Sequence, residues 1–120
     1  MFSYLKRLGN TFYRFVSTVP SAPPSHVHLH MVNESALNAN WYDVPLIHRN
    51  GVILGYRLLV QQEDGGPVVW NVTVGPDVRR YMFTNLEIFQ NYSTQILAFT
   101  IKGEGPLSAK VDQRTDGSGR

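Results

Sequence analysis

The sequence contains no cysteine among its 120 residues. A disulfide framework is therefore excluded, and the fold has to be stabilised by its apolar core. No segment approaches the roughly 20 consecutive apolar residues that a membrane-spanning helix needs. Lys6, Arg7 and Arg14 interrupt the N-terminal stretch, and no small-residue cleavage site follows an apolar run. We therefore expect neither a membrane span nor a signal peptide in this chain.

Strong charge and recognisable catalytic motifs are also missing. The net charge is only +2, and the basic residues form no cluster, so nucleic acid is not an expected partner. The stretch 103–115, GEGPLSAKVDQRT, has two glycines but lacks the helix start and the Lys-Ser/Thr pair of a phosphate loop. The acidic residues, Asp43 among them, fall in turns or at strand edges, where we expect them to be solvated. We expect no cofactor and no catalytic site.

The apolar content of 42% is enough for one packed core, and the length suits one domain. A proline-rich stretch at 18–25, TVPSAPPS, favours an extended linker. We expect an N-terminal extension at 1–19, one domain at 20–116 and a flexible tail at 117–120. The extension has an apolar stripe typical of a surface-lying helix, but it also reads as the end of a preceding module.

After the linker, apolar residues alternate with polar ones, the period of a half-buried strand. Turn signals such as Asn50-Gly51 and Gly75-Pro76-Asp77 separate the alternating segments at intervals of roughly ten residues. This spacing predicts an all-β sandwich of two antiparallel sheets. The seven expected strands lie at 26–31, 36–41, 55–62, 68–74, 79–86, 92–101 and 107–115.

Several motifs occur in order over about residues 20–116. In Trp41-Tyr42-Asp43-Val44-Pro45 a proline closely follows a tryptophan, and the segment 50–60 is an expected strand that contains Tyr56. Leu86 and Tyr92 lie six residues apart, and residues 98–108 follow as the last motif. In this order and spacing the motifs resemble the fibronectin type III family, with its core tryptophan followed by proline, its third strand, its leucine and tyrosine six residues apart, and its ending. Ile88 and Gln90 replace the Pro and Thr that are frequent in the family between that leucine and tyrosine.

The resemblance implies a seven-stranded, immunoglobulin-like sandwich. Tyr92 is expected to form a tyrosine corner, with its hydroxyl bonded to nearby backbone. The expected core is Trp41, Tyr56, Leu58, Tyr81, Phe83, Leu86, Tyr92, Ile96 and Ala98.

The resemblance also implies a non-catalytic protein–protein interaction and spacer module of a cell-surface adhesion molecule or receptor. The expected partners are an unidentified protein and adjacent domains of the same chain, and the expected location is extracellular or at the cell surface. Two alternatives stay open at this point: an intracellular structural scaffold module and an accessory domain of a larger secreted enzyme. Fold alone does not choose a ligand.

Three N-glycosylation sequons begin at Asn33, Asn71 and Asn91. Asn33 falls in an expected turn, Asn71 in or beside a strand, and Asn91 just before the inward-pointing Tyr92. We predict that at least one of these asparagines carries a glycan if the chain is secreted, against the alternative that the sequons occur by chance.

His26, His28 and His30 share one face of the first expected strand. Two such imidazoles can bind one metal ion, but zinc needs a further protein ligand, and the sequence supplies none nearby. We expect a solvated face rather than a metal site, with a pH-sensitive contact as a third interpretation.

Five residues are expected on the outer face of one sheet if Tyr92, Ile96 and Ala98 point inward. They would form an exposed apolar patch with a cation at its rim, the composition of an interaction surface. A neighbouring domain, the N-terminal segment or a register error would also explain them. The five partner-surface candidates are Arg57, Leu59, Leu97, Phe99 and Ile101.

Overall fold

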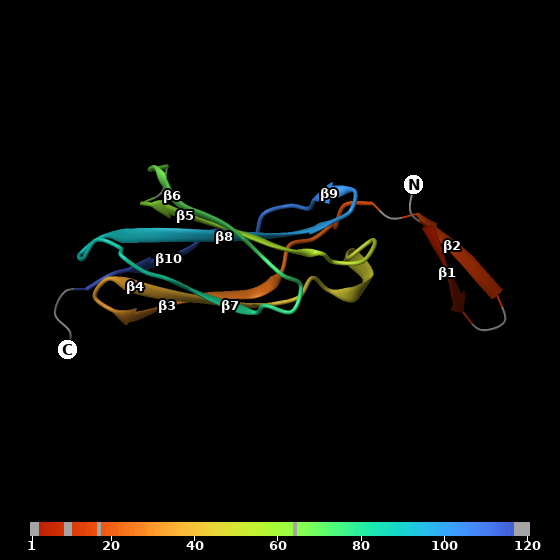
Figure 1. Cartoon of the computed structure of the whole chain (residues 1–120), viewed down its shortest axis with the longest axis horizontal. Helices are drawn as coiled ribbons and strands as arrows, with labels where there is room; N and C mark the ends of the chain where they lie inside the picture. The colour runs from red at the N-terminus through yellow and green to blue at the C-terminus, as the bar shows by residue number, and fades with distance from the viewer. Residues whose placement is uncertain (1–2, 9–10, 17, 64, 117–120) are drawn as a thin grey trace.

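The computed structural model describes residues 3–8, 11–16, 18–63 and 65–116. Two antiparallel sheets pack face to face (Figure 1), which confirms the predicted all-β sandwich. The smaller sheet has the order β3-β4-β7, and the larger has the order β10-β8-β5-β6, with β9 also paired to β8. The strands of the smaller sheet are β3 (Ser25–Asn33), β4 (Ala36–Tyr42) and β7 (Arg80–Phe83). Those of the larger sheet are β5 (Gly55–Gln62), β6 (Val68–Val74), β8 (Asn91–Thr100), β9 (Gly103–Glu104) and β10 (Val111–Arg114).

The last predicted strand, 107–115, is shorter in the structure, where only β10 (Val111–Arg114) is a strand, and β9 (Gly103–Glu104) lies in the predicted turn. The two strands pair with the two halves of β8. Between them the chain stays beside β8, because the Gly105 amide donates to the Ala98 carbonyl at 2.8 Å and the Ser108 amide to the Ile96 carbonyl at 2.9 Å. Pro106 has no N–H to give to a continuous ladder. The predicted hairpin is confirmed, but its turn lies at 101–102 and the strand that follows is interrupted between Glu104 and Val111.

Aromatic side chains join the two sheets. Trp41 from β4 meets Tyr56 from β5 edge to face, with ring centroids 5.7 Å apart, and Trp70 from β6 meets Phe83 from β7 at 5.6 Å. Such geometry stabilises a core by about 0.5–1.5 kcal/mol per pair beyond the area that it buries. The expected core residues are buried except Tyr81, which is partly buried and packs against Trp70.

A tyrosine corner fixes the loop before β8. The Glu87 amide donates to the Tyr92 hydroxyl at 2.8 Å, and the neighbouring Leu86 amide donates to the Ser35 carbonyl at 2.9 Å. Both bonds satisfy loop amides that would otherwise lack partners beside a buried leucine. The role predicted for Tyr92 is confirmed.

We expect the substitution Tyr92→Phe to lower the free energy of unfolding by about 1–3 kcal/mol, because it leaves the Glu87 amide without its acceptor. Chemical denaturation of the purified chain measures this loss. Tyr42→Phe is the control, since Tyr42 is 64% exposed; equal effects of the two substitutions would contradict the importance of the corner.

Gly55 is the first residue of β5 and lies where there is no space for a side chain. A Cβ there would collide with the carbonyl oxygen of Val74 and lie 2.9 Å from the Cζ atom of Phe99, whose ring lies over the glycine. Gly55 and Phe99 are cross-strand partners. The aromatic ring thus covers the backbone that the glycine leaves bare.

Gly55→Ala is expected to destabilise the domain by about 1–3 kcal/mol through overpacking. Gly75→Ala is the matched control, because a Cβ at Gly75 meets nothing within 4 Å, and we expect it to be neutral or slightly stabilising. Thermal unfolding of the two variants tests this, and a Gly55→Ala midpoint at or above that of Gly75→Ala would refute the steric argument.

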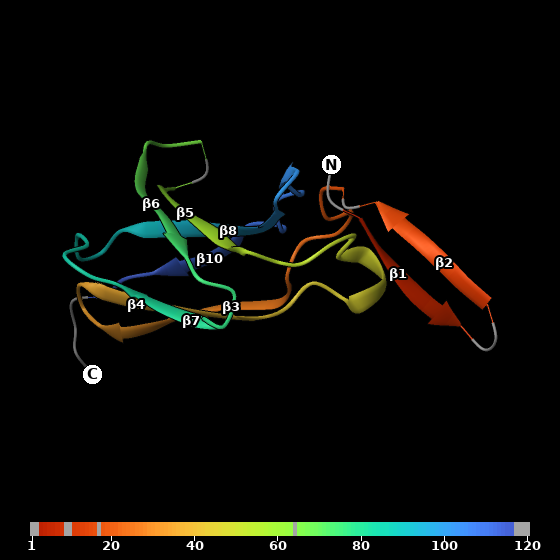
Figure 2. The ribbon, with the colours of Figure 1, turned by 45° about the vertical axis from the view of Figure 1, so that its right-hand side comes forward.

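The N-terminal extension forms a hairpin of β1 (Ser3–Leu8) and β2 (Thr11–Val16), which lies beyond one end of the sandwich (Figures 1 and 2). The interpretation of this segment as a surface-lying helix is wrong. Its apolar residues also fit strands, because short apolar segments do not separate the two periods. The predicted flexible tail at 117–120 lies outside the described residues. No helix in the described part of the chain is long and apolar enough to cross a membrane.

Candidate interaction surfaces

Three loops gather at the end of the sandwich where the linker enters. They are the loops 43–54, 75–79 and 101–107. Loop 43–54 contains the short 3-10 helix η1 (Leu46–His48). We call this end the N-terminal pole. Figure 2 shows η1 beside the linker that leads from β2 to β3.

Loop 43–54 binds the linker through its backbone and side chains. The Thr18 amide donates to the Asn50 carbonyl at 2.8 Å, and the Ser21 amide donates to the His48 carbonyl at 2.9 Å. The Asn50 side-chain amide in turn donates to the Val19 carbonyl at 3.1 Å. Asn50 has a φ of 57°, which asparagine tolerates better than most residues. The linker bends at Ser21 and Ala22 rather than being extended throughout, and these bonds hold it in place.

The opposite side of the linker contacts the end of β8 and the loop after it. The buried Thr100 hydroxyl donates to the Thr18 carbonyl at 2.8 Å. Pro20 is fully buried, and a Cβ on Gly105 would lie 2.8 Å from the Pro20 Cβ. A linker bonded on both sides has little freedom to swing, so it gives the chain a defined direction as it enters the sandwich.

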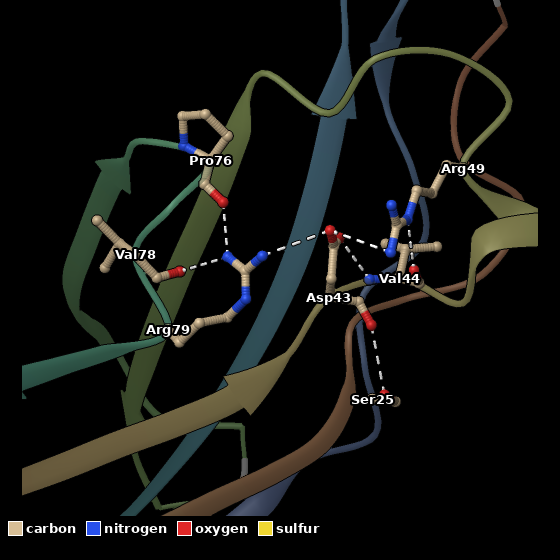
Figure 3. Close-up of polar contacts among 7 residues, drawn as sticks. All are labelled: Ser25, Asp43, Val44, Arg49, Pro76, Val78 and Arg79. Carbon is tan, nitrogen blue, oxygen red and sulfur yellow. Dashed lines mark hydrogen bonds and ion pairs between the residues drawn. The ribbon is translucent and has the colours of Figure 1, made fainter.

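Asp43 is the centre of a polar cluster at the pole (Figure 3). Its carboxylate accepts from the Val44 amide at 2.7 Å and lies 3.4 Å from an Arg49 nitrogen and 3.5 Å from an Arg79 nitrogen. Arg49 Nε also donates to the Val44 carbonyl at 2.8 Å, and the Ser25 hydroxyl donates to the Asp43 carbonyl at 3.3 Å. The side chain of Asp43 is 20% exposed, so the expectation of a solvated turn residue is wrong.

Arg79 connects this cluster to loop 75–79 and to the core. Its guanidinium donates to the Pro76 carbonyl at 2.6 Å and the Val78 carbonyl at 3.0 Å. Its Cζ lies 5.3 Å from the centroid of the Tyr56 ring, within cation–π range. Burial raises the pKa of the Tyr56 hydroxyl above its ordinary value, and Asp43 raises it further. The cluster therefore braces two loops against each other.

Sequence reasoning missed this cluster because its members are separated by up to 36 positions in the chain. No spacing rule connects Asp43, Arg49 and Arg79. The arginines donate to carbonyl oxygens and to Asp43, which indicates a structural role. A groove of 410 Å³ beside the cluster is lined by residues of both loops.

Exposed apolar side chains are concentrated at the N-terminal pole. Leu46 and Ile47 of η1 are 67% and 82% exposed, Val52 is 60% exposed and Ile101 is 66% exposed. The Leu54 amide donates to the Phe99 carbonyl at 2.9 Å, which brings the end of loop 43–54 beside the start of loop 101–107. This apolar surface is carried by braced loops.

The outer face of the larger sheet differs from its prediction. Leu97 is only 5% exposed, so its assignment to an exposed patch is wrong. Arg57 lies opposite Leu97 on the neighbouring strand. Its guanidinium forms an ion pair with Glu104 at 2.8 Å, and Glu104 is the cross-strand partner of Phe99. The arginine side chain therefore crosses this face beside Leu97.

The other four candidates on this face keep some exposure. Arg57, Leu59 and Phe99 are partly buried, and Ile101 is exposed at the pole. The predicted patch is therefore smaller than expected and continues into the apolar surface of the pole. Its use as a partner surface stays a prediction.

The sequon asparagines Asn33, Asn71 and Asn91 are all exposed. Asn33 is engaged in a turn, where its side-chain oxygen accepts from the Ser35 amide at 2.9 Å. Ser93, the hydroxyl residue of the third sequon, is 2% exposed. The three sequons thus differ in how accessible their side chains are.

His26, His28 and His30 are exposed on β3, as predicted for a solvated face. His26 stacks on Tyr42, with ring centroids 4.7 Å apart. Among the described residues, no three His, Cys, Asp or Glu side chains come together as metal ligands.

The fold, the tyrosine corner and the strand order define an immunoglobulin-like sandwich. The sequence model of the fibronectin type III domain matches residues 22–114, and the chain belongs to this family. The solved third fibronectin III domain of the human KIAA0343 protein has the same fold, with a TM-score of 0.72 and 24% identity, covering 84% of this chain and 86% of that one.

Relatives with higher identity are far longer proteins. The chain is 38% identical over 100 residues to chicken protein sidekick-1, covering 81% of this chain and 5% of the relative. It is 37% identical over 93 residues to the rat netrin receptor DCC, covering 78% and 6%. It is 30% identical over 98 residues to the Drosophila cell adhesion molecule Dscam2, covering 75% and 4%. These cell-surface relatives support an adhesion or receptor module.

Thr100→Val is expected to loosen the linker, because it removes the hydroxyl that donates to Thr18 while it keeps the shape of the side chain. We expect hydrogen exchange at the Thr18 and Ser21 amides to accelerate, with a loss of stability of about 1 kcal/mol. Thr84→Val is the control, because Thr84 is only partly buried and follows β7 at the end of the sandwich opposite the linker. Unchanged exchange at both amides would show that this bond does not hold the linker.

Proposed function

We propose that this chain is an extracellular, non-catalytic module of a cell-surface adhesion or receptor protein, which binds a protein partner and sets the spacing of its neighbours. The observation that carries the proposal is the 37–38% identity to sidekick-1 and the netrin receptor DCC over most of the chain. The matched segment covers only 5% of sidekick-1 and 6% of DCC, as expected for one module of a much longer protein.

The spacing role is supported by the linker. A preceding module would attach through residues 18–21, which are bonded to loop 43–54 and to β8. The β1–β2 hairpin has the antiparallel form of the last two strands of such a sandwich, and a hairpin alone is marginally stable in water. We assign residues 1–19 to the end of a preceding module.

The binding role is assigned to the N-terminal pole. Exposed apolar side chains on braced loops favour association because little conformational entropy is lost when a partner binds them. Ile101 connects the pole to the partly buried Leu59 and Phe99 on the outer face of the larger sheet. Arg57 supplies the cation at the rim.

An antibody against the 120-residue chain tests the location. We expect it to stain unpermeabilised cells that express the endogenous protein. Staining that appears only after permeabilisation would instead support the intracellular scaffold module.

The substitution Ile101→Glu is expected to weaken binding of the secreted chain to partner-bearing cells by about tenfold or more, since it places a charge in a desolvated contact. Ile88→Glu is the matched control, because Ile88 is also exposed but lies in the loop before β8, at the opposite end of the sandwich. Cell-surface titration with labelled chain measures both, and an equal loss in both variants would exclude the pole as the binding surface.

A further inference from the structure

Strand β6 forms one edge of the larger sheet. It pairs with β5, and the described part of the chain contains no strand on its other side. The sequence from Gly65 to Pro76 contains no charged residue, and four of the seven residues in β6 are valine. An uncharged, β-branched edge strand is a template for pairing with another chain.

The other edge strands carry protective features that β6 lacks. In the smaller sheet, β7 has only four residues and includes Arg80, while β3 has two register shifts. In the larger sheet, β10 includes Asp112 and Arg114. Charges, short length and bulges are the usual devices that keep edges from pairing.

A register shift protects only the first part of β6. The shift lies between the pairs Val60–Trp70 and Gln61–Val68, which leaves Val69 as the extra residue. From Trp70 to Val74 the pairing is regular. This regular part has no charge and no proline, so a further device is needed there.

Asn71 lies within this regular part and points outward. Trp70 and Val72 pack against the core, so Asn71 and Thr73 are on the opposite face, and both are exposed. Asn71 lies opposite Leu59, and Thr73 opposite Arg57. Both sequon side chains are therefore accessible, whereas Ser93 of the Asn91 sequon is buried.

We propose that Asn71 carries an N-linked glycan, and that this glycan prevents the edge of β6 from pairing with a second copy of the chain. The inference rests on the proposed extracellular function, because the glycan is added in the secretory pathway. In the transfer, the Asn71 amide nitrogen bonds to C1 of a lipid-pyrophosphate-linked oligosaccharide. The bond from C1 to the pyrophosphate oxygen breaks, the lipid pyrophosphate leaves, and the amide proton passes to a base of the transferase.

The test uses the whole 120-residue chain secreted from eukaryotic cells behind a cleavable signal. Peptide mass spectrometry measures occupancy at each sequon, and light scattering after size-exclusion chromatography measures the oligomeric state. Thr73→Ser keeps the sequon and is expected to stay glycosylated at Asn71 and monomeric, like the parent chain.

Two variants that lack this sequon distinguish the effect of the glycan on the oligomeric state from the effect of the uncharged edge. Thr73→Ala removes the glycan and leaves the edge uncharged, and we expect dimers whose fraction rises with concentration. Thr73→Glu also removes the glycan but adds a charge opposite Arg57 on β5, a favourable cross-strand pair, and we expect a monomer. If Thr73→Ala is not secreted, an endoglycosidase that trims the parent chain's glycans to a single N-acetylglucosamine gives the comparison, because it keeps the Asn71 amide and leaves the edge uncharged.

The outcomes distinguish this inference from the proposed function. A bare Asn71 beside an occupied Asn33 or Asn91 overturns the inference and leaves the extracellular assignment intact. A glycosylated Asn71 with a monomeric Thr73→Ala variant overturns the shielding role alone. A secreted chain with all three sequons bare overturns the inference, while the staining of unpermeabilised cells still decides the location.

Discussion

The contact between Trp41 and Tyr56 is the interaction on which the rest of the structure depends. It joins the two sheets without a disulfide, with ring centroids 5.7 Å apart. The Tyr56 ring also lies beneath the Arg79 guanidinium, 5.3 Å from its Cζ, and Arg79 reaches Asp43. The core thus positions the polar cluster, and the cluster positions loop 43–54. Because that loop bonds to the linker, the direction of the incoming chain is determined by packing between the sheets.

The alternation of apolar and polar residues predicts burial correctly on the inner face of the larger sheet, but it fails for Leu97 on the outer face. Alternation places Tyr92, Ile96 and Ala98 inward, and all three are buried. Alternation also places Leu97 and Arg57 outward, but it does not show that the Arg57 side chain crosses this face to reach Glu104. The Asp43 cluster was equally invisible, because it forms only when loops distant in sequence meet. The alternation within one strand predicts which face of the sheet a residue lies on. How exposed its side chain is depends on contacts with residues distant in the sequence.

The two proposed uses of the larger sheet adjoin at Leu59 and Arg57, which lie opposite Asn71 and Thr73. Asn71 lies at the β6 edge, opposite Leu59, whereas Ile101 lies beyond the end of β8, at the pole. A glycan at the edge would restrict access to Leu59 and leave the pole open. This division fits the exposure of the apolar residues, since Leu59 is partly buried and Ile101 is 66% exposed.

The proposed spacing role requires the chain to be held at both ends of the sandwich, and the end opposite the pole is also bonded. The fully buried Thr115 donates its hydroxyl to the Glu87 carbonyl at 2.6 Å, and its amide donates to the Gln90 carbonyl at 2.9 Å. The same loop is fixed by the tyrosine corner through the Glu87 amide. A following module would therefore start from a loop anchored to β8, the strand whose other end holds Thr18. Because one strand connects both anchors, a rotation of either neighbour has to be resisted by the central pairing of β5 with β8, where the core is most fully buried.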